Sequence, residues 1–129
     1  MNVWRVDDPT LYDDTHVDTH VTIRHLFESH HLVVVWFGFV PGQGLRDHHT
    51  SSHALIQCIS GAIRVESMGE AVELTTGMSV VIEPHVRHAL YAMERAVVQL
   101  SMTPHPSQHS LLEALRLSTG PGTSAEPRP

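Results

Sequence analysis

The feature that most constrains the fold is the regular placement of Gly and Pro between short runs of β-branched and aromatic residues. From Val17 to Met102 such a break occurs roughly every ten residues, a spacing typical of antiparallel strands joined by tight turns. No run has the length and period of a core helix. The pattern therefore predicts an all-β sandwich or barrel. The expected strands are Val21–Phe27, Leu32–Val40, Ala54–Ile59, Ala62–Glu66, Ala71–Leu74, Ser79–Ile82, His88–Met93 and Ala96–Met102.

Eight strands is the number found in a jelly roll. In two of the runs apolar and polar side chains alternate, which predicts one face toward the core. The residues expected to face inward there are Ile63, Val65, Val72 and Leu74. The Leu32–Phe37 stretch is apolar at every position and is therefore expected to be covered on both faces. A second subunit could supply the second cover, so we expect a homodimer.

The length of 129 residues suits one domain. We expect an N-terminal arm over residues 1–16, a folded domain over 17–117 and a disordered tail over 118–129. A capping box at Ser110–Glu113, followed by leucines at helical spacing, predicts a short C-terminal helix that closes the domain.

Composition excludes several classes of function. The chain has 14 acidic residues against 8 basic ones, all of them Arg and scattered, so a nucleic-acid partner is not expected. The absence of Lys excludes Schiff-base chemistry. The longest apolar stretch is too short to span a bilayer, and the single Cys with no apolar leader favours a cytoplasmic protein.

The 12 His residues are the most unusual part of the composition. Two segments, Pro41–Gly61 and Gly77–His88, each place histidines beside the end of an expected strand, with Gly at set distances. In a jelly roll, segments separated in this way can lie on neighbouring strands. We therefore expect their histidines to meet at one mouth of the barrel.

In these segments the sequence resembles the cupin superfamily. The first cupin motif is Gly, five residues, His-x-His, three or four residues, Glu, six residues, Gly, and Gly42, His48 and Gly61 match it. The second motif is Gly, five residues, Pro-x-Gly-x-x-His, and Gly77 and His88 match it. The resemblance covers Leu32–Met102 and implies the cupin double-stranded β-helix, with a divalent metal held at the barrel mouth.

The chain departs from the motifs at two of the four positions that hold the metal in the family. Thr50 stands at the second His position and Ala54 at the Glu position. In the second motif Glu83 replaces Pro and His85 replaces Gly. Only His48 and His88 therefore remain of the ligand set that the resemblance implies.

Three arrangements of donors are compatible with these residues. His49 or His53, turned inward by a bulge or a one-residue shift, could complete a three-histidine site for Fe, Mn, Ni, Cu or Zn. Asp47 or Glu83 could instead join His48 and His88 in a two-histidine, one-carboxylate set. In the third arrangement the two histidines are satisfied by hydrogen bonds and no metal binds.

Polar or aromatic side chains inside a small barrel usually contact a ligand. The candidates for substrate contact are Trp36, Gln57, Tyr91 and Gln99, all expected to line the barrel. Cys58 lies in an apolar strand and is expected to be a buried, inert thiol.

Two functions follow from these expectations. The first is a metal-dependent enzyme acting on a small anionic or enol-type molecule, or on dioxygen, as a dioxygenase or isomerase-like cupin. The second is a non-catalytic, small-molecule-binding or sensory cupin that works without metal.

Overall fold

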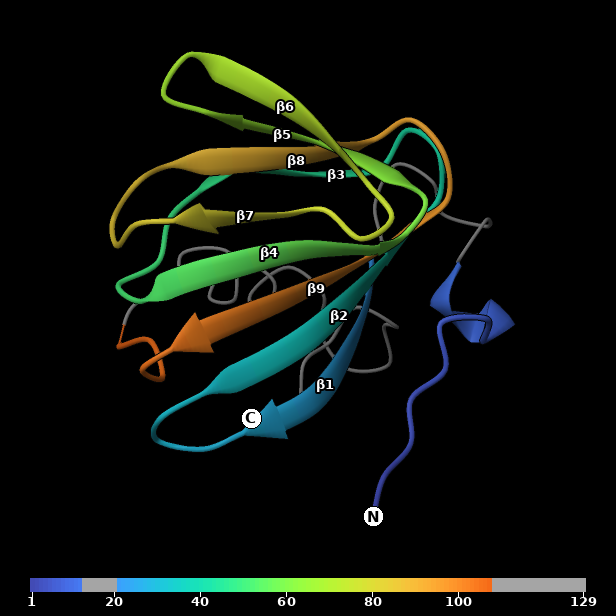
Figure 1. The fold of residues 1–129 in the computed structure, drawn as a ribbon, viewed down its shortest axis with the longest axis horizontal. Coiled ribbons are helices and arrows are strands. Elements are labelled where there is room, and N and C mark those ends of the chain that lie inside the picture. Colours follow the sequence, from blue (N-terminus) through green and yellow to red (C-terminus); the bar gives the residue numbers. More distant parts are fainter. Residues whose placement is uncertain (13–20, 108–129) are drawn as a thin grey trace.

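Two antiparallel sheets face each other and enclose one hydrophobic core (Figure 1). The computed structural model describes residues 1–12 and 21–107. The elements are η1 (Pro9–Leu11), β1 (Thr22–Glu28), β2 (Val33–Phe39), β3 (Gly44–His48), β4 (His53–Ser60), β5 (Ala62–Ser67), β6 (Glu70–Thr75), β7 (Ser79–Ile82), β8 (His88–Ala92) and β9 (Ala96–Thr103). The larger sheet has the order β1-β2-β9-β4-β7 and the smaller one β3-β8-β5-β6. This is the expected jelly-roll barrel.

All eight expected strands are present, and the described residues contain a ninth, β3. Its sequence, Gly-Leu-Arg-Asp-His, follows Pro41 and Gly42 and has only one aliphatic residue, so it gives no apolar alternation. Pairing with β8 makes it a strand at the edge of the smaller sheet. The expected C-terminal helix and the tail lie outside the described residues.

The alternation in β5 and β6 places side chains as expected, with one informative exception. Ile63, Val65 and Leu74 are buried in the core. Val72 lies opposite Val65 in the β5–β6 register and so faces the same side, yet it is 42% exposed. β6 and β7 are edge strands of different sheets, so Val72 stays partly exposed among the described residues.

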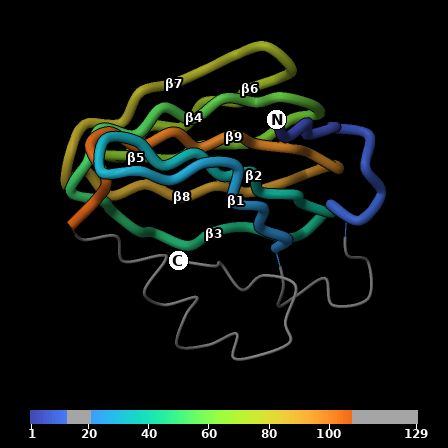
Figure 2. Tube along the Cα trace, turned by 90° about the horizontal axis from the view of Figure 1, so that it is seen from below, coloured from blue at the N-terminus to red at the C-terminus, as the bar shows by residue number. Residues whose placement is uncertain are grey.

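The second cover of β2 is the N-terminal arm of the same chain, which Figures 1 and 2 show outside the barrel. Leu11 of η1 is buried in a small apolar cluster with Trp36 and Val97. The arm lies so close to β2 that a Cβ on Gly38 would be 1.9 Å from the Leu11 carbonyl oxygen. Its own arm therefore covers the part of β2 for which the sequence suggested a second subunit. The homodimer itself stays a prediction.

None of the helices in residues 1–12 and 21–107 has the length and apolar character required to span a bilayer.

Candidate functional site

The two histidines kept from the motifs meet on the inner face of the smaller sheet. His48 on β3 and His88 on β8 are directly opposite in register, and their ring centroids are 4.2 Å apart. Both side chains are nearly fully buried, at 4% and 2% exposure. The sequence expectation that these two rings share one end of the barrel is thus met by the geometry.

A β-bulge in β3 makes this meeting possible. Leu45 pairs with Leu90 and His48 pairs with His88, so three steps along β3 match two steps along β8. The extra residue lets Leu45 and His48 both face inward, although an odd spacing would put them on opposite faces of a regular strand. Arg46 and Asp47, between them, are both exposed. The bulge therefore orients His48 itself and does not bring in the neighbouring His49.

Backbone carbonyls fix the protonation of the two rings. The Nδ1 of His48 is 2.7 Å from the carbonyl oxygen of Arg46, and the Nδ1 of His88 is 3.0 Å from that of Val86. A carbonyl oxygen can only accept, so each Nδ1 carries the proton and donates it. Each Nε2 is then the nitrogen with a lone pair, able to accept a hydrogen bond or bind a metal.

Burial keeps both rings neutral. Desolvation, together with the proximity of His88, lowers the pKa of His48 to about 4. Desolvation also lowers the pKa of His88 from its ordinary value. At neutral pH the pair therefore presents uncharged acceptors and no cation.

The remaining donors expected for a metal do not join this pair. His53 is exposed, and its Nε2 lies 3.2 Å from a carboxylate oxygen of Glu83 on the surface. Asp47 is exposed and accepts a 2.7 Å hydrogen bond from Arg87. His49 follows His48 in the chain and is partly exposed. In the part of the chain that the structure describes, no three His, Cys, Asp or Glu side chains are grouped so that they could hold a metal ion.

The chemistry at the two altered motif positions agrees with that finding. Ala54 is fully buried in the apolar core and has no donor atom. Thr50 is buried, but a neutral hydroxyl is a poor substitute for imidazole as a ligand of Fe, Mn, Ni, Cu or Zn. The four-donor metal centre that the cupin motifs imply does not fit the described residues.

A groove of about 490 Å³ opens beside the histidines, between the β5–β6 hairpin and β7. It is lined by Val65, Ser67, Met68, Glu70, Ala71, Val72, Val80, Val81, Ile82, Glu83 and Val86. Ser67 is the register partner of His88, and Val86 supplies the carbonyl that holds the His88 ring. One end of the groove therefore adjoins the row His48, His88, Ser67 that crosses β3, β8 and β5.

The four side chains expected to line the barrel lie on its outer surfaces. Trp36 donates from Nε1 to Oε1 of Gln99 at 3.0 Å, and Gln99 donates from Nε2 to Gln57 at 3.2 Å. These three residues form a row across β2, β9 and β4 on the face away from the core. Tyr91 is 40% exposed on the outer face of the smaller sheet.

The barrel-lining prediction for these four residues is wrong, because their immediate neighbours point inward. Val35 and Phe37 flank Trp36, and Leu90 and Ala92 flank Tyr91, and all four of these neighbours are in the core. Alternation then turns the polar residue outward. The core between the sheets is formed mainly by aliphatic and aromatic side chains instead. The valines of the groove were missed, because sequence alone does not distinguish an exposed valine such as Val72 from a core residue.

More than half of the chain matches the model of a known protein family. Residues 35–103 match the family model of the cupin domain. The chain belongs to the cupin family. No curated protein sequence matches this cupin at a significant level.

Solved structures show the same fold. A Klebsiella pneumoniae protein with a double-stranded β-helix domain has a TM-score of 0.71 at 18% identity, over 86% of this chain and 96% of its own. A conserved protein of Streptococcus pyogenes has a TM-score of 0.67 at 21% identity, over 81% and 91%. KdgF from Halomonas sp. has a TM-score of 0.62 at 25% identity, over 66% and 81%.

Proposed function

We propose that this cupin binds a small, largely apolar molecule in the groove between β6 and β7, without the metal centre typical of the family. The observation that carries the proposal is the junction of the groove with the buried histidine row at Ser67 and Val86. A groove of this size, in which apolar side chains are accompanied by a few polar ones, suits a small molecule. The function is therefore that of a binding or sensory cupin.

Each part of the site has a separate role in this proposal. The valines and Ile82 supply apolar contact area, which is the main source of binding free energy. Ser67 supplies a polar contact whose orientation is set by its 2.8 Å hydrogen bond to the carbonyl oxygen of Arg87. Because that hydroxyl is held before any ligand arrives, little ordering free energy is lost on binding.

The experiment is a thermal-shift and NMR screen of small metabolites in the presence of a chelator. A ligand that binds the folded state raises the melting temperature and shifts resonances of groove residues. The test variant is Val72→Trp, which places an indole in the groove at an already exposed position. Its matched control is Glu73→Trp, on the opposite face of the same strand.

Loss of the ligand-induced shift in Val72→Trp, with the shift retained in Glu73→Trp, is the expected result. A ligand whose shift survives Val72→Trp does not bind in the groove. If only metals raise the melting temperature, the proposal is wrong.

A metal-dependent enzyme is the second candidate, and one observation favours it. Both histidines hold Nδ1 against a backbone carbonyl, the support that metal-ligating histidines usually have. Elemental analysis of untagged protein decides between the two candidates. Stoichiometric Fe, Mn, Ni, Cu or Zn that is lost in both His48→Ala and His88→Ala would support the enzyme and contradict a metal-free site.

A further inference from the structure

The groove presents a hydrogen-bond acceptor, the Ser67 oxygen, to a ligand. Ser67 donates its hydroxyl proton to the carbonyl oxygen of Arg87 at 2.8 Å, so its oxygen retains only lone pairs for a ligand. His88, the register partner of Ser67, is buried and does not itself line the groove. The side-chain proton of Ser67 is therefore already used within the protein.

The charged groups at the groove are both acidic. Its lining includes Glu70 and Glu83 and no Arg or His. Glu83 is paired with His53, whereas Glu70 has no ion-pair partner among the described residues. Glu70 lies at the start of β6, on the exposed rim of the groove.

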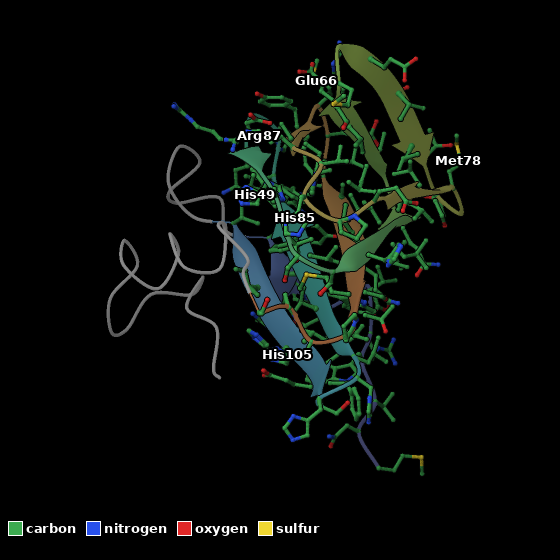
Figure 3. The ribbon with its side chains drawn as sticks, turned by 90° about the vertical axis from the view of Figure 1, so that its left-hand side faces the viewer. His49, Glu66, Met78, His85, Arg87 and His105 are labelled. Carbon is green, nitrogen blue, oxygen red and sulfur yellow. The ribbon has the colours of Figure 1, made fainter. Side chains whose placement is uncertain are left out.

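Arg64 and Arg87 are engaged in ion pairs on the outer face of the smaller sheet. Arg64 pairs with Glu66 at 2.7 Å, and Arg87 pairs with Asp47 at 2.7 Å. Figure 3 shows Arg87 and Glu66, one from each pair. Neither guanidinium lines the groove, so a negatively charged ligand would find no cation there.

We infer that the ligand of this groove is a compact apolar molecule that carries a hydrogen-bond donor, as an alcohol, phenol or protonated amine, and bears no negative charge. This inference deepens the proposed function and rests on it. A buried carboxylate or phosphate without a donor or a cation loses its hydration with no compensation. A hydroxyl or ammonium group can instead donate to the Ser67 oxygen, which lines the groove. The anionic substrate expected from the sequence does not suit this groove.

The test uses three probes of one size: benzyl alcohol, benzylamine and benzoate. Each is titrated into the full chain at pH 7.5 with a chelator, and NMR follows the methyl groups of Val72 and Val80 and the ring nitrogens of His88. We expect saturable shifts with the alcohol and the amine, and binding of benzoate at least about tenfold weaker, which corresponds to about 1.4 kcal/mol.

A pair of charge-neutralising variants tests the contribution of the rim. Glu70→Gln should weaken binding of the amine a few-fold at low salt and leave the alcohol unchanged, because only a charged ligand gains from the carboxylate. Glu73→Gln is the matched control, with the same change of charge on the outer face of the same strand. An equal effect of both variants would contradict the role given to Glu70.

The outcomes separate this inference from the proposed function. If benzoate binds as tightly as the other two probes, the ligand class is wrong and the binding function stands. If none of the three shifts the groove resonances at millimolar concentration, the inference and the binding function are both wrong.

Discussion

At the scale of single residues, the site depends on two imidazoles that are buried as neutral rings. Charging either ring would place a cation among Leu45, Leu90 and the surrounding apolar side chains, with the other ring 4.2 Å away. Each Nδ1–H donates to an uncharged backbone carbonyl. Burial therefore keeps both rings neutral, with the proton on Nδ1 and the lone pair on Nε2.

Stability should fall as the pH is lowered through the range in which only the unfolded chain takes up protons. An unfolded His titrates near 6.5, and the pKa of folded His48 is about 4. The stabilisation is complete above pH 6.5 and is lost progressively toward pH 4, by about 3 kcal/mol for this residue. Urea unfolding at several pH values measures it. In His48→Gln the free energy of unfolding should fall less steeply with pH than in the unsubstituted chain. The exposed control His30→Gln should show the same fall as the unsubstituted chain. A flat profile between pH 7 and 5 would contradict the prediction.

Cys58 should react with thiol reagents only when the barrel opens. Burial raises the pKa of its thiol, and Sγ lies 3.4 Å from the carbonyl oxygen of Gly61. Few thiolates form, and the reagent has no access. At pH 8 the rate of labelling should match the rate of unfolding and rise steeply in urea. Labelling within seconds in the native protein would show that the thiol is accessible.

At the scale of elements, both sides of β2 are covered within one chain, and an arm replaces the expected partner. Val33, Val35, Phe37 and Phe39 enter the core, while Trp36 lies under the arm. The absence of a side chain at position 38 lets η1 approach the strand. Arg24 secures the contact by donating 2.8 Å and 3.2 Å hydrogen bonds to the hydroxyl and carbonyl oxygens of Thr10.

Gly38→Ala should therefore displace the arm. The new methyl group would overlap the Leu11 carbonyl oxygen, and relieving such an overlap costs about 1–3 kcal/mol in packed regions. The change is measured by urea unfolding and by the fluorescence of Trp36 as it becomes exposed. In a chain that lacks residues 1–12 the same substitution should cost nothing, because its clash partner is gone. An equal cost in both backgrounds would mean that the arm is not the cause.

At the scale of the whole molecule, the groove exists because the two sheets end at different edges. β6 closes the smaller sheet, β7 closes the larger one, and neither pairs with the other. The histidine row lies in the smaller sheet alone, and Ser67 at its end lines the groove between the sheets. The candidate site is thus a property of the arrangement of the sheets.

The homodimer predicted from the sequence would use the outer face of the larger sheet. Leu55 and the 55% exposed Val81 are register partners there and leave apolar area exposed. Sedimentation equilibrium at micromolar concentration should show a dimer, and Leu55→Glu should convert it to a monomer. Val72→Glu, on the face toward the groove, is the control and should stay dimeric. A monomeric unsubstituted chain would contradict the prediction.

Much of the fold and half of the site could be predicted from the sequence. Strand positions follow from alternation and turn residues, which are local properties, and the His48 and His88 pair follows from motif spacing. The strand Gly44–His48 could not be found, because its pairing with β8 and not its composition makes it a strand. The faces of Trp36 and Tyr91 were assigned by polarity, whereas the pleat of each strand decides them.

The sequence by itself determined that the chain is a small jelly-roll cupin with half of the usual metal ligands, since periodicity and residue identity are written along the chain. Only the tertiary structure decided what lies beside His48 and His88. A bulge turns His48 inward, and burial keeps the histidine pair neutral. The open edge between β6 and β7 forms a groove beside the pair, lined by valines and two glutamates. The pairing of His48 with His88 joins residues forty positions apart, and only folding brings such residues together.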